Sequence, residues 1–148
     1  MIRSIGRPPL PTEEVTPSPR SGCYYSLYSS NLFLLTGAAY FAYPPARFAG
    51  MYVSFVLVFV TSLLYHRRSF EVPKDPRVAA ADKAMVYLTI GLIGGCFYDR
   101  PEYYVCVAMI AMVHDSINHT DRVPEKALRH AGMHVVANLS ALYMLTLP

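Results

Sequence analysis

The chain has 148 residues, of which 53% are hydrophobic and 16% are charged, and its net charge is +3. Because a soluble domain usually carries about a quarter charged residues, this composition argues against both a disordered chain and an ordinary water-soluble domain. Three cysteines are too few, and odd in number, for a disulfide framework. The composition therefore predicts an integral membrane protein.

Residues 1–26 form a predicted flexible tail on the cytoplasmic side. Prolines between Pro8 and Pro19 lie among Ser, Thr, Arg and Glu, and such a segment cannot bury enough apolar surface to offset the entropy of ordering. The tail has no continuous apolar run, so we do not expect a secretory signal peptide. Residues 27–148 are predicted to form a transmembrane helical domain.

Apolar segments of roughly membrane-spanning length follow the tail. Crossing a hydrocarbon core takes about 20 residues, and about 17 at the least. The segments lack the alternation of polar and apolar residues that would indicate a β-barrel. The predicted fold is therefore an all-α, polytopic transmembrane bundle of about five helices. These helices are expected at residues 26–43, 48–65, 78–98, 103–114 and 127–147.

The fourth segment is short for a crossing, and a re-entrant helix is the alternative. The positions of lysine and arginine favour a crossing. If all five segments span, each of the 13 basic residues except Arg47 and Arg100 lies on the side of the N-terminus. Basic residues concentrate on the cytoplasmic side of membrane proteins. We therefore expect a multi-pass protein with its N-terminus in the cytoplasm.

All five histidines fall on that same side. His130 and His134 are four residues apart, so both imidazoles project from one face of a helix and can chelate one ion. His66, at the end of another helix, can supply a third nitrogen. Three histidines with a fourth position left for water are typical of catalytic zinc. His66, His130 and His134 are therefore the predicted Zn²⁺ ligands.

Ser62 and Asp82 are the predicted catalytic residues beside these ligands. Ser62 lies one turn before His66 and therefore on the same helix face, where its hydroxyl is placed to hydrogen-bond a developing oxyanion or a ligand. Asp82 opens the third segment at the same membrane level. There it is placed to orient a zinc-bound water or accept its proton, because zinc lowers the pKa of such a water to about 7.

Each of these residues also has a purely structural interpretation. The two histidines of the last helix could be interfacial anchors, Asp82 could complement a helix dipole, and Ser62 could bond to a carbonyl of its own helix. His114 and His119 are interpreted as loop residues that at most support the ligands. Asn138 could line the same cavity or hydrogen-bond a neighbouring helix.

Together these motifs resemble the CREST superfamily, which comprises alkaline ceramidases, PAQR receptors with bacterial hemolysin III proteins, and myomaker-like membrane proteins. SLLYHR at residues 62–67 is similar to the serine–tyrosine–histidine run of hemolysin III and PAQR proteins, and DKAMVYLTIG at residues 82–91 is similar to the start of their third helix. The resemblance covers residues 50–98 well and residues 127–147 by the H-x-x-x-H motif. Because the family has seven membrane helices, this chain resembles a shortened member.

The resemblance implies zinc ligation by the three histidines, a role for Asp82 on the metal-bound water, and a lining role for Ser62. It implies hydrolysis of a lipid amide, as in ceramidases, with membrane lipids as partners. The alternatives are a non-enzymatic receptor or membrane-remodelling protein with structural zinc, and a helical membrane protein that binds no metal. A homo-oligomer could supply the walls that a five-helix bundle lacks. Nucleic-acid binding is not expected, because the basic residues flank membrane segments.

Overall fold

The computed structural model describes residues 20–43, 49–67 and 75–147, and these ranges contain helices and no strand. The predicted all-α fold with five helices is therefore confirmed. The first 19 residues of the predicted tail lie outside the described ranges. The helices are α1 Arg20–Ala42, α2 Ala49–His66, α3 Pro76–Phe97, α4 Pro101–Asn118 and α5 Val123–Leu145.

Three of the five helices begin with a proline in their first turn. Proline suits this position because its missing N–H would have no partner there, and its fixed φ is already helical. Asp75 caps α3 by accepting a hydrogen bond from the backbone N–H of Arg77 at 2.9 Å. The start predicted for the first helix, at residue 26, is wrong, because α1 begins at Arg20. The last helix also begins earlier than the predicted residue 127, since α5 begins at Val123.

The end predicted for α4 at His114 is also wrong. The helix continues to Asn118 and has 18 residues, or about 27 Å at 1.5 Å per residue. Ser116 donates its hydroxyl to the carbonyl of Val113, and Thr120 donates to the carbonyl of Ser116, each at 2.7 Å. These side chains satisfy carbonyls near the helix end, so the polar stretch after His114 does not end the helix.

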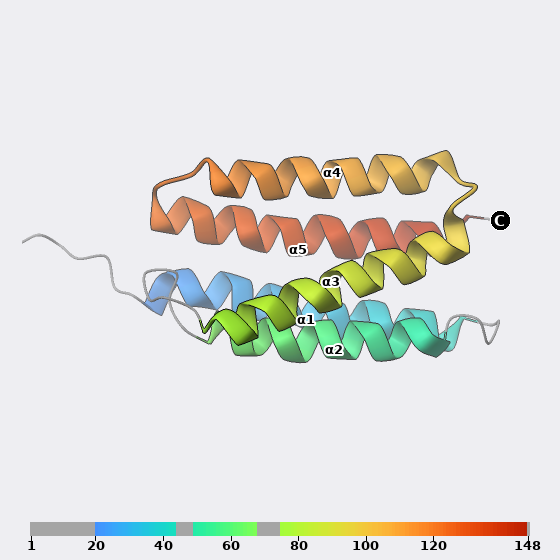
Figure 1. Ribbon diagram of the computed structural model, residues 1–148, viewed down its shortest axis with the longest axis horizontal. Helices are drawn as coiled ribbons and strands as arrows, with labels where there is room; N and C mark the ends of the chain where they lie inside the picture. Colours follow the sequence, from blue (N-terminus) through green and yellow to red (C-terminus); the bar gives the residue numbers. More distant parts are fainter. Residues whose placement is uncertain (1–19, 44–48, 68–74, 148) are drawn as a thin grey trace, which may run out of the picture.

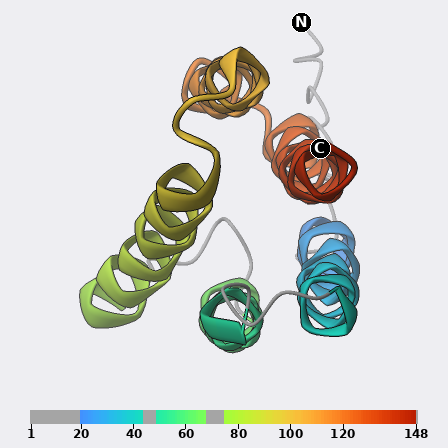
Figure 2. The same ribbon diagram turned by 90° about the vertical axis from the view of Figure 1, so that its right-hand side faces the viewer.

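The five helices lie roughly along one direction and form an arc rather than a closed ring (Figures 1 and 2). Around the arc α1 packs against both α2 and α5, α3 packs against α2, and α4 packs against α5. Although α3 and α4 follow each other in the chain, they make few contacts. One of these contacts is a 3.1 Å hydrogen bond from the Tyr103 hydroxyl to the carbonyl of Ile90.

The interface between α1 and α5 is held by buried polar contacts. The hydroxyl of Thr36 donates to Oδ1 of Asn138, and the hydroxyl of Tyr40 donates to the carbonyl of Ala141 at 2.8 Å. Asn138 in turn donates its amide to the carbonyl of His134 at 2.7 Å. Of the two interpretations for Asn138, the bond to a neighbouring helix is therefore the one observed. These contacts fix the register of the helix that carries two of the predicted ligands.

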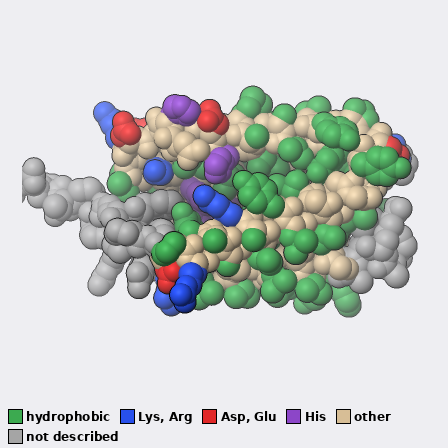
Figure 3. Space-filling model, in the orientation of Figure 1, with side chains coloured by type: hydrophobic (Ala, Val, Ile, Leu, Met, Phe, Trp, Pro, Cys, Tyr) green, Lys and Arg blue, Asp and Glu red, His purple; other side chains and the backbone are tan. Residues whose placement is uncertain are grey.

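Within the described residues, α3 is the one helix that is both long enough and apolar enough to cross a membrane. The stretch Gly50–His66 of α2 is apolar but shorter. Large apolar side chains are exposed on every helix, among them Phe41, Leu64, Tyr87 and Leu139. Figure 3 shows hydrophobic side chains spread along the visible face, while charged groups gather mainly at one end.

Gly37 allows the close approach of α1 and α2. A Cβ atom at this position would lie 3.0 Å from Cβ of Phe55 and 3.6 Å from the backbone oxygen of Tyr52. We expect Gly37→Leu to lower the free energy of unfolding by about 1–3 kcal/mol, because the two helices must move apart. Thermal unfolding in detergent, followed by circular dichroism, measures this loss.

Gly91→Leu is the matched control, because a Cβ at Gly91 would meet no atom within 4 Å. This variant gains helix propensity without overpacking, so its unfolding temperature should not fall. Equal destabilisation of both variants would contradict the role assigned to Gly37.

Candidate metal centre

The metal centre is built from the end of α2 and the first half of α5. His66 is the last residue of α2 and is only 1% exposed. His130 and His134 follow each other by one turn of α5, and His134 is 4% exposed. Side chains four residues apart share a helix face, and here that face turns toward His66. Two helices that are distant in the sequence thus bring three imidazoles together.

The three histidines form a compact group. One ligand atom from each of His66, His130 and His134 can be chosen so that all three lie within 4.8 Å of one another. The ring centroids of His66 and His130 are 4.5 Å apart, and those of His130 and His134 are 4.8 Å apart. The prediction that these residues can share one metal ion is therefore confirmed.

The donor set fits a zinc ion. Nitrogen atoms on one tetrahedral zinc lie about 3.3 Å apart, given zinc–nitrogen bonds of about 2.0–2.1 Å. The most distant pair, at up to 4.8 Å, must therefore approach by about 1.5 Å when zinc binds. No carboxylate or thiol of the described residues joins the group, so the set leaves a coordination position for water or substrate.

His134 is fixed by contacts from α1. Its Nδ1 lies 2.9 Å from the hydroxyl oxygen of Ser29, and the edge of its ring packs on Phe33 with centroids 5.1 Å apart. Both neighbours belong to one face of α1, which packs on α5. A hydrogen bond and an aromatic contact together hold the imidazole in one orientation before any metal binds.

Ser62 is buried and lies 3.0 Å from the hydroxyl oxygen of Ser30. The hydroxyl of Ser30 also lies 2.7 Å from the carbonyl oxygen of Ser26, and either oxygen can be the donor in the pair that Ser30 forms with Ser62. Ser62 lines the cavity, so its hydroxyl can donate to a ligand there or accept from one. The structural interpretation of Ser62 was a hydrogen bond to a carbonyl of its own helix. The bond observed for its hydroxyl is instead the one to Ser30 on α1.

Asp82 lies two turns inside α3, and the cap of that helix is Asp75. This placement removes the helix-dipole interpretation of Asp82, because dipole effects are confined to the first turn. Its side chain lines the same cavity as Ser62, His130 and His134. The oxygen Oδ1 is buried and has no hydrogen-bond partner in the described protein. A buried carboxylate oxygen without a partner is costly, which makes it a candidate proton acceptor.

The cavity has a volume of about 100 Å³ and is lined by residues of all five helices. Most of its lining is apolar, with Phe33, Val86 and Ile93 among the contributors. Its polar lining residues are few, and four of them are the site residues Ser62, Asp82, His130 and His134. An apolar pocket with a few convergent polar groups is typical of a ligand site.

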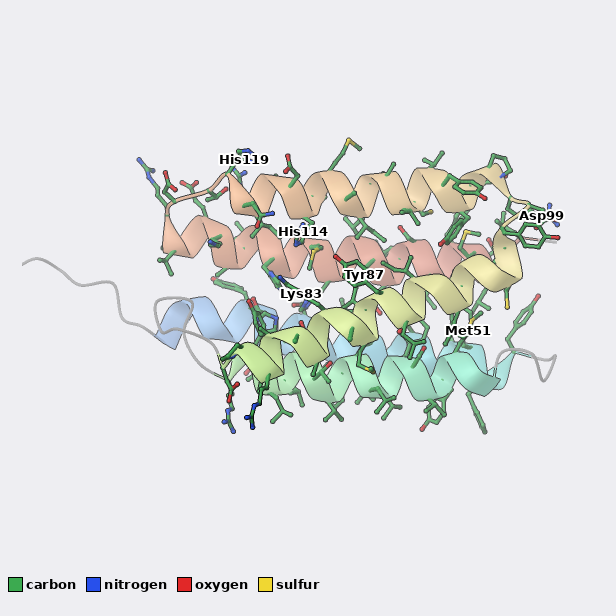
Figure 4. All side chains as sticks on the ribbon, in the orientation of Figure 1. Met51, Lys83, Tyr87, Asp99, His114 and His119 are labelled. Carbon is green, nitrogen blue, oxygen red and sulfur yellow. The ribbon has the colours of Figure 1, made fainter. Side chains whose placement is uncertain are left out.

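His114 and His119 do not join the metal centre. Both are exposed, and Nδ1 of His119 lies 3.0 Å from the carbonyl of Asp115 and 3.5 Å from its carboxylate. Figure 4 shows His119 at the end of α4, pointing away from the other helices. Their predicted role as supports for the ligands is not seen, and His114 lies inside α4 rather than in a loop.

Sequence reasoning missed the contribution of α1. Ser29 and Ser30 touch the site residues His134 and Ser62, yet neither was predicted as a site residue. A signal was present, because serines recur at positions 26, 29 and 30 and Thr36 follows, and residues three, four and seven apart share a helix face.

Comparisons with known proteins do not add to this description. A scan against protein-family models, a search of curated proteins and a search of solved structures each found no match to the chain.

Proposed function

We propose that this chain is a multi-pass membrane hydrolase that cleaves a lipid amide with a zinc ion held by His66, His130 and His134. The observation that carries the proposal is a group of three histidines with no fourth protein ligand among the described residues. Beside the group lies an apolar cavity that also contains a carboxylate. The N-terminus and the histidine end of the bundle are assigned to the cytoplasm.

Helix length and surface chemistry support a membrane location. The five helices have 18 to 23 residues, or about 27–35 Å at 1.5 Å per residue, which suits a hydrocarbon core of about 30 Å. Every helix exposes large apolar side chains, and extended apolar surface is typical of a region that contacts a membrane or another protein. Buried hydroxyl and amide contacts between α1 and α5 are typical of membrane helix packing.

The composition of the metal group favours catalysis over a structural role. Structural zinc is held by four protein ligands, whereas catalytic zinc keeps a position open. A structural site would need Asp82 as the fourth ligand, but Asp82 lies outside the group of ligand atoms. The receptor or remodelling alternative therefore has less support than the hydrolase.

The cavity favours a lipid as the substrate. Its volume of about 100 Å³ is smaller than the roughly 150 Å³ cavity that holds benzene, so it can enclose only a short part of an acyl chain. The weak contact between α3 and α4 leaves the remaining chain a route into the bilayer. Membrane lipids are thus the partners of the site. A second copy of the chain is a candidate for covering the weak contact between α3 and α4.

The residues of the cavity have distinct roles in amide hydrolysis. Zinc, when bound, supplies Lewis acidity at the scissile carbonyl and lowers the pKa of a coordinated water. Asp82 takes the proton of the attacking water on Oδ1 and delivers it to the leaving nitrogen as the carbon–nitrogen bond breaks. Ser62 accepts a hydrogen bond from the water or the amide N–H. The products are a fatty acid and an amine.

The resemblance of residues 62–67, 82–91 and 130–134 to the CREST superfamily supports the same proposal. In that comparison the zinc ligands, the aspartate and the serine fall on the residues that line this site. This chain has five helices where the family has seven. Because the difference is an even number of crossings, the last helix still enters the membrane from the cytoplasmic side.

The direct test is release of fatty acid from ceramides and other lipid amides by zinc-loaded protein in detergent or liposomes. We expect Ala137→Phe, which fills the cavity from α5, to lower kcat/KM for long-chain amides by about tenfold or more, since about 1.4 kcal/mol of lost transition-state binding has this effect. Leu139→Phe is the control, because Leu139 is exposed on the same helix and should leave turnover unchanged. Absence of fatty acid release from any lipid amide by the zinc-loaded wild type would overturn the hydrolase.

A further inference from the structure

Three serines, Ser26, Ser29 and Ser30, lie on one face of α1, and the hydroxyls of two of them share a single acceptor. The carbonyl of Ser26 receives the hydroxyl of Ser29 at 3.1 Å and the hydroxyl of Ser30 at 2.7 Å. All three side chains are buried. Because a hydroxyl has one proton, each of these two bonds determines what the serine oxygen can do toward its other neighbour. That neighbour is His134 for Ser29 and Ser62 for Ser30.

The proton count links Ser29 to the tautomer of His134. The hydroxyl oxygen of Ser29 lies 3.1 Å from the carbonyl oxygen of Ser26 and 2.9 Å from Nδ1 of His134, and either atom of the second pair can be the donor. A metal on Nε2 of His134 needs the lone pair of that atom, and a neutral imidazole carries one N–H. Metal binding through Nε2 therefore requires the proton on Nδ1, with Ser29 accepting it and donating its own proton to the carbonyl of Ser26.

We propose that Ser29 is a positioning residue that presets His134 for metal binding by accepting its Nδ1–H. This inference rests on the metal site of the proposed function and adds a residue from a helix that carries no ligand. Hydrogen-bonded partners of this kind fix both the tautomer and the orientation of a ligating histidine. The contact also ties the position of α1 to the metal centre, because movement of α1 away from α5 would break it.

The test is the affinity for zinc itself, measured by competition with a chromophoric chelator on detergent-purified full-length protein. We expect Ser29→Ala to weaken zinc binding by about 10–100-fold, as is typical when the hydrogen-bond partner of a ligating histidine is removed. Ser29→Thr retains the hydroxyl and should bind zinc nearly as tightly as the wild type. Nitrogen-15 chemical shifts of His134 in the metal-free protein report the tautomer directly and should show protonated Nδ1 in the wild type.

Ser26→Ala is a closely matched control. The hydroxyl of Ser26 is buried one turn away and has no partner within the described residues, and the substitution leaves the carbonyl that anchors Ser29 in place. We expect unchanged zinc affinity for this variant. Wild-type affinity in Ser29→Ala, or equal losses in Ser29→Ala and Ser26→Ala, would overturn the inference. A wild type that binds zinc but hydrolyses no lipid would overturn the proposed function while leaving the role of Ser29 intact.

Discussion

His134→Ala is expected to remove zinc from the purified protein almost completely. The wild type should carry about one zinc ion per chain, whereas two remaining histidines form a much weaker chelate. His134 is also the most constrained ligand, since it contacts both Ser29 and Phe33 on α1. Metal analysis of protein prepared in detergent without chelators measures the difference.

The same variant should lose the stabilisation that zinc provides. A ligand that binds only the folded state adds about 2.7 kcal/mol at a free concentration one hundred times its Kd. Added zinc should therefore raise the unfolding temperature of the wild type and leave that of His134→Ala unchanged. This comparison separates a lost ligand from a protein that has failed to fold, because the variant unfolds cooperatively only if it is folded.

His114→Ala is the matched control for this experiment. His114 is an exposed histidine of α4 that lies outside the metal group. The zinc content of the His114→Ala protein should therefore equal that of the wild type. Equal loss of zinc from His134→Ala and His114→Ala would indicate that zinc binds nonspecifically to surface histidines and not at the metal centre. A wild type without zinc would exclude the metal centre and leave a helical bundle with interfacial histidines.

The parts of this site that could be predicted from the sequence are those fixed by helix periodicity and chain direction. The four-residue spacing of His130 and His134 determines a shared face wherever the helix lies. Alternation of direction through successive helices then places the end of α2 and the start of α5 at the same end of the bundle. The meeting of His66 with His130 and His134 also needs the packing of α1 against both α2 and α5, which these two regularities do not give.

The parts that could not be predicted depend on which face of a helix turns inward. Apolar residues surround α1 on all sides, so its apolar pattern does not identify the inward face, and the recurrence of small hydroxyl residues from Ser26 to Thr36 on one side is the one sign of it. The end of α4 was misplaced for a different reason. Polar residues after His114 suggested a loop, but the hydroxyls of Ser116 and Thr120 bond to backbone carbonyls near the helix end.

Asp82→Asn is expected to lower turnover by about 10²–10⁴-fold, the usual contribution of a general base, while zinc content stays near that of the wild type. The amide has nearly the same shape as the carboxylate, so packing in the cavity is preserved, but it cannot take a proton from water at neutral pH. Fatty acid release and metal content, measured on the same preparation, give the two quantities that decide the result.

Glu102→Gln is the matched control for a carboxylate-to-amide change. One oxygen of Glu102 is also buried without a partner in the described protein, but this residue lies in the first turn of α4, at the opposite end of the bundle from the histidines. Turnover and zinc content should both remain near the wild-type values. A general effect of removing a buried negative charge would instead appear in both variants.

The outcome for zinc in Asp82→Asn separates the two functions proposed for a metal centre of this kind. If the variant keeps its zinc and loses turnover, Asp82 acts on the attacking water and the open coordination position is used for catalysis. If zinc is lost as completely as in His134→Ala, Asp82 is a fourth ligand. A centre closed by three histidines and a carboxylate has no position for water, and the chain would then be a receptor or remodelling protein with structural zinc.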